Sequence, residues 1–233
     1  MAAGLAIVGY GKMGHMIEAL APQHGFEVRV RLDVQENSGG AGLTAENLRG
    51  VDVAIEFSSP ATAADNVRRL AKLRVSTVVG TTGWYDELPS VRAAAEQYGA
   101  GVVYAPNFSV GVNLFQQIVA EAAKRFAARG EYQAWGWEMH HSQKLDAPSG
   151  TLLKLAETMV ESGYDRHIDI SSSRAGAVPG THEIGFDSAA DTITLRHTAR
   201  SREGFADGAL RAARWVIGKK GLFAFQEILG ELG

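Results

Sequence analysis

The chain has 233 residues, of which 45% are hydrophobic and 21% charged, a composition typical of one large or two small globular domains. It contains no cysteine, which excludes disulfides, thiolate nucleophiles and thiolate metal sites. Its formal net charge of -3 comes without a block of like charges, which argues against a nucleic-acid partner.

The first residues form a short apolar run that leads into a glycine loop, with no positive charge before it. This pattern indicates a strand and not a signal peptide. No apolar stretch approaches the length of a membrane span. We therefore expect a cytoplasmic protein with no membrane partner.

The first hundred residues alternate short runs rich in Val and Ile with longer helix-like runs. Continuous apolar runs of this length predict strands that are buried on both faces. The expected strands are residues 5–8, 27–32, 52–57, 75–79 and 101–104, and the expected helices are residues 12–24, 60–73 and 86–98. This order predicts a parallel sheet with helices on both faces, as in an α/β protein.

The pattern changes near residue 106. A helix is expected over residues 112–129, where Leu114, Ile118, Ala122 and Phe126 recur every four residues. Alternating runs predict strands with one covered face and one free face, at residues 132–139, 167–172, 181–186 and 192–197, with further helices at 151–162 and 205–217. The second half is therefore α+β with a mostly open sheet, and a free sheet face favours self-association.

A glycine loop, G-x-G-x-x-G, separates the first expected strand from the first expected helix. Gly9 permits a tight turn, Gly11 lets the backbone approach a pyrophosphate, and Gly14 lets the helix pack on the strand. The spacing alone is a weak signal in a chain with 27 glycines, but its position before a helix N-terminus favours dinucleotide binding. Met13 lies in the same loop.

Asp33 ends the second expected strand, at the usual distance for a carboxylate that binds the adenosine ribose. A carboxylate there disfavours the 2′-phosphate of NADPH, whereas Lys12 in the glycine loop would attract it. The sequence therefore leaves NADH, NADPH or both open as cofactors. It also leaves open a loop carboxylate with no ligand.

The segment from Glu138 to Thr151 carries the other candidate site. Its D-A-P-S-G-T portion is a helix-start signal, with Pro near the first turn and Ser or Thr able to cap, and a helix start can bind an anion. Lys144 adds a positive charge, so the group suits a carboxylate. His140 and His141 would point in opposite directions on an extended backbone, and one of them suits proton transfer.

The residue types alone leave open a structural histidine pair and a simple helix cap. A metal site is not expected, because the chain has neither cysteine nor an H-x-x-x-H spacing.

The run E-x-H-H-x-x-K-x-D-A-P-S-G-T at residues 138–151 resembles the signature of the 4-hydroxy-tetrahydrodipicolinate reductase family, also called dihydrodipicolinate reductase. Other matching pieces spread over nearly the whole chain, at residues 8–14, 80–83, 105–113, 174–176, 180–182, 197–202 and 205–209. The resemblance implies a Rossmann-type dinucleotide-binding domain of residues 1–106 and 201–233, and a substrate-binding and tetramerisation domain of residues 107–200 with a mixed sheet.

The resemblance also implies residue roles. His140 is the proton donor, and Lys144 assists it and binds a substrate carboxylate. The other residues implied in the substrate pocket are His141, Ser149, Gly150, Thr151 and Arg202. The residues implied beside the nicotinamide half of the cofactor are Phe57, Ser58, Gly80, Thr82, Ala105, Asn107 and Phe108.

The implied reaction is the NAD(P)H-dependent reduction of 4-hydroxy-tetrahydrodipicolinate to tetrahydrodipicolinate in lysine and diaminopimelate biosynthesis. A hydride is added to the conjugated imine of a small cyclic dicarboxylate, and the protein supplies a proton. The expected assembly is a homotetramer.

Two positions depart from the family pattern. Asp187 and Asp191 stand where Gly and Glu are more usual, which bears on loop or subunit contacts and not on the chemistry. The loop at residues 37–42 is also short and rich in glycine.

Two other functions stay open on the residues alone: a different Rossmann dehydrogenase, such as an amino-acid dehydrogenase, and a nucleotide-sensing module without turnover. The D-A-P-S-G-T segment opposes the first, and the presence of both His140 and Lys144 opposes the second.

Overall fold

The computed structural model describes residues 2–232. These residues form two compact units. Unit 1 contains the described residues up to Val110 and those from Glu203 onward, and unit 2 is Gly111–Arg202. The boundaries expected from the sequence, after residues 106 and 200, lie a few residues earlier, and the roles attached to the two domains stay predictions at this point.

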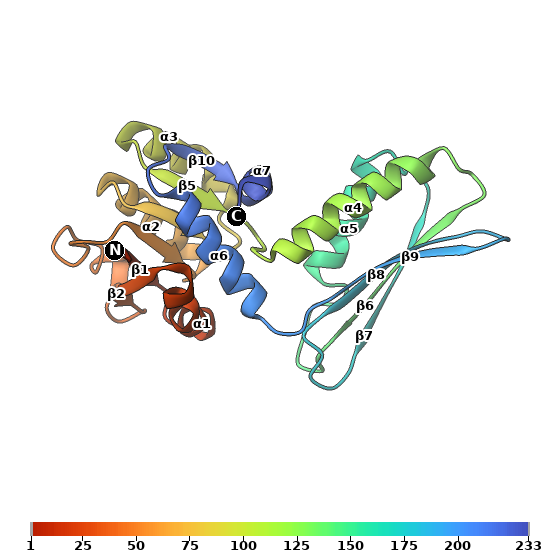
Figure 1. The fold of residues 1–233 in the computed structure, drawn as a ribbon, viewed down its shortest axis with the longest axis horizontal. Coiled ribbons are helices and arrows are strands. Elements are labelled where there is room, and N and C mark those ends of the chain that lie inside the picture. The colour runs from red at the N-terminus through yellow and green to blue at the C-terminus, as the bar shows by residue number, and fades with distance from the viewer. Residues whose placement is uncertain (1, 233) are drawn as a thin grey trace. The chain divides into compact units, whose positions relative to one another are not determined.

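Unit 1 is built around a six-stranded parallel sheet (Figure 1). Its strands, in the order β10-β5-β4-β3-β1-β2, are β1 (Ala3–Val8), β2 (Phe26–Leu32), β3 (Val53–Glu56), β4 (Ser76–Val79), β5 (Gly101–Tyr104) and β10 (Gly221–Ala224). Every residue of β3 and β4 is buried, as expected for strands covered on both faces, and this includes the polar Glu56, Ser76 and Thr77. The predicted parallel α/β sheet is confirmed.

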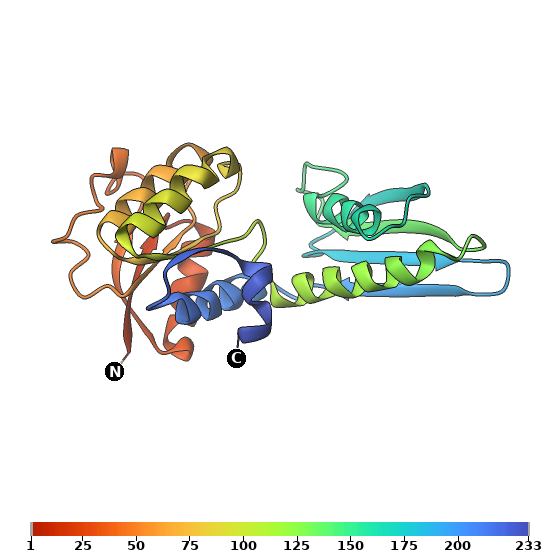
Figure 2. The same ribbon diagram turned by 90° about the horizontal axis from the view of Figure 1, so that it is seen from above.

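Helices cover both faces of this sheet. Helices α1 (Lys12–Leu20) and α6 (Glu203–Val216) lie on one side, and α2 (Pro60–Lys72) and α3 (Leu88–Tyr98) lie on the other (Figure 2). The short helix α7 (Phe225–Ile228) follows β10. Ala209, Ala212 and Ala213 of α6 are fully buried, because small side chains let the helix approach the sheet closely.

The helix expected over residues 12–24 is wrong at its C-terminal end. Helix α1 ends at Leu20, and a 3-10 helix follows over Ala21–His24. Pro22 explains the change, because proline has no N–H to donate to the preceding turn. Other 3-10 helices lie at Ser38–Gly40, Tyr85–Glu87 and Leu229–Glu231.

Unit 2 is a four-stranded mixed sheet with two helices on one face. Its strands, in the order β7-β6-β8-β9, are β6 (Gln133–His140), β7 (Ile168–Arg174), β8 (Thr181–Asp187) and β9 (Thr192–Thr198). Among these described strands, β6 and β7 pair in parallel, and the other two pairs are antiparallel. Helices α4 (Val110–Ala127) and α5 (Gly150–Glu161) share one core with the sheet, in which Val119, Leu152 and Ile184 are fully buried. The predicted open mixed sheet is confirmed.

Within residues 2–232, no helix combines the length and the apolar character that crossing a membrane would need.

Candidate functional site

The loop between β1 and α1 carries glycine at three positions for different reasons. Gly9 has a positive φ of 91°, and a Cβ on it would collide with the Phe57 carbonyl oxygen. A Cβ on Gly14 would lie 2.6 Å from the Gly9 oxygen, so glycine lets α1 pack on the loop. A Cβ on Gly11 would meet nothing within 4 Å. The middle position is therefore open, at the positive end of the α1 dipole, where Lys12 and Met13 form the first helical residues.

Asp33 follows β2 and is tied to this loop, because its carboxylate accepts a hydrogen bond from the Tyr10 N–H at 3.2 Å. A cavity of about 550 Å³ lies here, lined by Tyr10, Arg31, Asp33, Val34, Gln35 and Glu36, and its volume suits a ligand the size of a nucleoside. Arg31 was not singled out from the sequence. The guanidinium of Arg31 and the carboxylate of Asp33 line the same cavity. The Arg31 Nε donates to Glu18 at 2.8 Å.

Three of the residues expected beside the nicotinamide follow neighbouring parallel strands. Phe57 comes after β3, Gly80 after β4 and Ala105 after β5, so all three lie at the carboxyl edge of the sheet, where open α/β sheets bind ligands. A Cβ on Gly80 would collide with the Phe57 ring. Glycine at this position therefore lets the ring lie against the end of β4.

The remaining residues expected on the cofactor side differ in exposure. The Ser58 N–H donates to Glu56 at 3.2 Å, and the Asn107 side chain accepts from the Ser109 N–H at 2.8 Å. Thr82 is exposed. Phe108 is 2% exposed, so its ring belongs to the core of unit 1.

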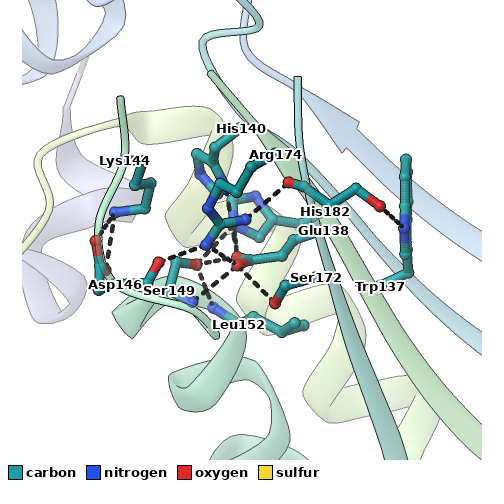
Figure 3. A network of polar contacts seen from close by, with 11 residues as sticks. Trp137, Glu138, His140, Lys144, Asp146, Ser149, Leu152, Ser172, Arg174 and His182 are labelled. Carbon is teal, nitrogen blue, oxygen red and sulfur yellow. Dashed lines mark hydrogen bonds and ion pairs between the residues drawn. The ribbon is translucent and has the colours of Figure 1, made fainter. Parts of the chain in front are cut away.

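The second group of expected site residues lies in unit 2, where β6 ends and α5 begins (Figure 3). His140 is the last residue of β6 and is buried, whereas His141 is half-buried in the following turn. The Lys144 ammonium donates to both carboxylate oxygens of Asp146, at 2.7 and 2.9 Å. This contact with Lys144 holds the pKa of the Asp146 carboxyl below its usual value.

Ser149 caps helix α5, because its hydroxyl oxygen accepts from the Leu152 N–H at 3.2 Å. Pro148 directly precedes the cap, which agrees with the expected position near the first helical turn. Gly150 and Thr151 are the first two residues of the helix. Arg202 is exposed at the end of unit 2.

The carboxylate of Glu138 lies at the centre of this group and is fully buried (Figure 3). Its Oε1 accepts from the Ser149 N–H at 2.9 Å and from the Arg174 guanidinium at 2.8 Å. Its Oε2 accepts from the Ser149 hydroxyl and lies 3.5 Å from both His140 Nδ1 and His182 Nε2. One carboxylate therefore contacts the start of α5 and both histidines.

Strand register brings these residues together. Ser172 on β7 and His182 on β8 pair with Glu138 on β6, and Arg174 on β7 pairs with His140. The Ser172 hydroxyl adds a hydrogen bond to Glu138 Oε1 at 3.0 Å. Residues that are far apart along the chain thus become neighbours at the same end of one sheet.

Burial and hydrogen bonding set the charges of this group. Burial raises the pKa of the Glu138 carboxyl, but hydrogen bonds from Ser149 and Arg174 outweigh that effect and keep the pKa below its usual value. Burial lowers the pKa of His182 to about 4, and the neighbouring His140 adds to the shift. Glu138 is therefore ionised and His182 neutral near neutral pH.

Burial also lowers the pKa of His140. The Glu138 carboxylate opposes this shift, whereas the cations of Lys144 and Arg174 add to it. The acidity of His140 thus depends on a buried anion and on two nearby cations.

Donor atoms of Glu138, His140 and His182 lie within 4.8 Å of one another, a spacing that a metal ion would allow. However, both carboxylate oxygens already accept hydrogen bonds, from Ser149 and from Arg174. We therefore describe the group as a hydrogen-bonded network.

Glu138, Arg174 and His182 were given no role in the site predicted from the sequence. Glu138 had a usable signal, because it lies two residues before His140 on a strand and so shares its face. Arg174 and His182 lie in pieces that resemble the family, at residues 174–176 and 180–182, but no local spacing places them beside Glu138, because their proximity depends on strand register.

Two family models match the chain: "Dihydrodipicolinate reductase, N-terminus" over residues 3–108 and "Dihydrodipicolinate reductase, C-terminus" over residues 111–229. The chain belongs to the dihydrodipicolinate reductase family. The family predicted from residues 138–151 is thereby confirmed, and with it the prediction of an oxidoreductase.

Individual members of the dihydrodipicolinate reductase family match along almost their full length. The chain is 34% identical to the 4-hydroxy-tetrahydrodipicolinate reductase of Christiangramia forsetii, over 98% of each chain. It is 33% identical to that of Methanoregula boonei, over 94% of each chain. The structure of dipicolinate-bound dihydrodipicolinate reductase from Paenisporosarcina sp. TG-14 matches with a TM-score of 0.77 at 26% identity, over 98% of this chain and 100% of that one.

Proposed function

We propose that the chain reduces 4-hydroxy-tetrahydrodipicolinate to tetrahydrodipicolinate with NADH or NADPH, in lysine and diaminopimelate biosynthesis. The observation that carries this proposal is the gathering of His140, Lys144 and Ser149 at the end of β6, in a chain that matches this family of reductases along its length.

The residues of unit 1 fit a dinucleotide. The glycine loop is open at Gly11, and the adjoining cavity of about 550 Å³ contains the Asp33 carboxylate. We assign the pyrophosphate to the α1 N-terminus, the adenosine ribose to Asp33, and the nicotinamide half to Phe57, Gly80 and Ala105. When bound, the reduced nicotinamide supplies a hydride to the substrate.

The residues of unit 2 suit the rest of the reaction. His140 would donate the proton, and its Nε2 is available for this because Gly180 beside it has no side chain: a Cβ there would lie 3.0 Å from Nε2. The substrate carboxylates would bind Lys144, Arg202 and the start of helix α5, which combine positive charge with backbone N–H groups. Because Asp146 holds the Lys144 ammonium in this structure, a substrate carboxylate would share or replace that contact.

A turnover assay tests the proposal directly. The product of dihydrodipicolinate synthase is supplied with NADH and NADPH separately, and oxidation of each nucleotide is followed. In parallel, a panel of amino acids is supplied with NAD+ and NADP+, and reduction of each nucleotide is followed. We expect oxidation of NADH or NADPH with the synthase product and no turnover of any amino acid. Turnover of an amino acid instead would identify a different dehydrogenase, and NADH binding without any turnover would identify a nucleotide-sensing module. Cytoplasmic placement and a homotetramer stay predictions.

A further inference from the structure

We infer that Glu138 is a positioning residue that couples the proton donor His140 to the substrate-carboxylate site at the start of α5. The inference rests on the proposed function, which makes His140 the donor and the start of α5 part of the substrate-carboxylate site. It adds a residue to which the sequence assigned no role.

The first contact of Glu138 is with the helix start. Ser149 donates both its N–H and its hydroxyl to the Glu138 carboxylate, and its hydroxyl oxygen also accepts from the Leu152 N–H. Ser149 is therefore fixed at three points and is 2% exposed. The orientation of the first turn of α5, which includes Gly150 and Thr151, follows from the position of this one residue.

The second contact of Glu138 is with the imidazole of His140. Nδ1 of His140 is buried, has no hydrogen-bond partner among residues 2–232, and lies 3.5 Å from Glu138 Oε2. Hydrogen bonds in catalytic groups are often this long until the reacting complex forms. A proton on Nδ1 would face the carboxylate, which leaves Nε2, beside Gly180, to carry the proton that is transferred.

A purely structural ion pair does not explain the arrangement. Arg174 binds only Oε1, whereas Oε2 is directed at Ser149 and the two histidines. A buried ion pair does need hydrogen bonds to its remaining lone pairs, and the Ser149 hydroxyl supplies one to Oε2. The two histidine nitrogens at 3.5 Å are additional to that requirement.

The charged and titratable groups around His140 come from several elements. Glu138 is on the same strand, Arg174 on β7, His182 on β8, and Lys144 and Asp146 in the loop before α5. Glu138 and Asp146 favour the protonated imidazole, and Lys144 and Arg174 oppose it. Removing Glu138 or Arg174 should therefore move the titration of His140 in opposite directions.

The experiment follows the His140 imidazole by NMR and the pH profile of kcat/KM in the intact chain. For Glu138→Gln we expect the His140 titration to move to lower pH by on the order of one unit, as loss of a neighbouring opposite charge implies. Above both pKa values the protonated fraction of His140 then falls about tenfold, and kcat/KM should fall with it.

The Arg174→Gln variant supplies a shift of the opposite sign, to higher pH. A general loss of structure cannot produce opposite shifts from two substitutions on neighbouring strands. Glu138→Asp keeps the negative charge, so its His140 titration should lie closer to that of the wild type than the titration in Glu138→Gln does. The matched control is Glu157→Gln, because Glu157 is also a paired carboxylate in unit 2, bound to Lys154 at 2.8 Å on the exposed side of α5, and we expect no shift.

The outcomes separate this inference from the proposed function. A His140 titration that is the same in wild type, Glu138→Gln and Arg174→Gln would overturn the role of Glu138, whether or not the enzyme turns over. Absence of turnover in the wild type, with opposite NMR shifts in the two variants, would overturn the proposed function and still support the link between Glu138 and His140. If Glu138→Gln does not fold, Arg174→Gln and Glu138→Asp decide the question.

Discussion

The inward-facing side chains of β6 change character along the strand. Ala134 and Gly136 face the core of unit 2, and Glu138 and His140 continue the same buried face as polar residues. A buried polar group costs free energy unless it is hydrogen-bonded, and the network around Glu138 meets that requirement for the carboxylate. His140 Nδ1 and Arg174 Nε are both buried without a hydrogen-bond partner among the described residues. For the imidazole, this is consistent with a group that works by exchanging a proton.

We predict that His140→Ala lowers kcat far more than it raises KM. A general acid contributes about 10²–10⁴-fold to the rate, and the groups proposed to bind the substrate carboxylates, Lys144 and the start of α5, would remain. Steady-state kinetics of the purified variant measure both constants. A kcat close to that of the wild type would show that another group donates the proton.

The Lys144→Ala variant tests whether the substrate site and the cofactor site are separate. It should damage turnover and substrate binding, yet leave NADH affinity almost unchanged, because Lys144 belongs to unit 2 and not to the glycine loop. Calorimetric titration with NADH measures this, and a large loss of NADH affinity would contradict the separation of the two sites.

Asp33 and Lys12 are predicted to set cofactor choice in opposite directions. The Asp33 carboxylate lines the cavity beside the glycine loop and should repel a 2′-phosphate, whereas the Lys12 ammonium should attract it. Asp33→Ala should shift the ratio of kcat/KM toward NADPH, and Lys12→Ala should shift it toward NADH. If neither variant changes the ratio, both assigned roles are wrong.

The glycines of the loop between β1 and α1 serve two different purposes, packing and space for a ligand. At the β1–α1 junction, Gly14 lies against the Gly9 carbonyl oxygen, whereas Gly11 has open space around it. The same motif therefore contains one position that serves the fold and one that is free to serve a ligand.

This difference predicts distinct effects of two alanine substitutions. Gly14→Ala should lower the free energy of unfolding by about 1–3 kcal/mol, as overpacking does, because its Cβ would lie 2.6 Å from a backbone oxygen. Gly11→Ala should leave the unfolding free energy close to wild type but weaken NADH binding. Urea denaturation and calorimetry measure the two effects. Equal stability losses in both variants would refute the distinction.

The elements with strong periodicity could be predicted from the sequence. The edge strand β10 and the site residues that are brought together by strand register could not. Strand β10, Gly221–Ala224, was missed although β3, β4 and β5 are equally short. It lies after helix α6, outside the strand and helix alternation of the first hundred residues, and joins their sheet only by pairing with β5. In the site, His140, Lys144 and Ser149 lie in one continuous segment and could be found together. Arg174 reaches Glu138 only through the parallel pairing of β6 with β7, a register that no local pattern specifies.

We predict that one face of the unit 2 sheet is covered by another chain. Helices α4 and α5 cover one face, while Thr192, Thr194 and Arg196 of β9 are exposed. The alternation over residues 192–197 puts Ile193 on the opposite face from Thr192 and Thr194, yet it is 42% exposed, because β9 is an edge strand of the sheet.

We predict a homotetramer with closed symmetry, the usual form of soluble oligomers. Light scattering coupled to size exclusion should give about four times the chain mass of 24.9 kDa. A monomer at micromolar concentration would contradict the prediction. A dimer would restrict the interface to one pair of surfaces and would also contradict it.

Unit 1 is assembled from two stretches of chain separated by the whole of unit 2. Helix α6 covers one face of its sheet and β10 pairs with β5 at its edge, and both are synthesised after Arg202. On the ribosome, unit 2 can therefore close as a continuous segment while the earlier strands of unit 1 still expose an apolar face and an unpaired edge. Such surfaces are prone to aggregate, so chaperone demand during translation should end only when the last elements emerge.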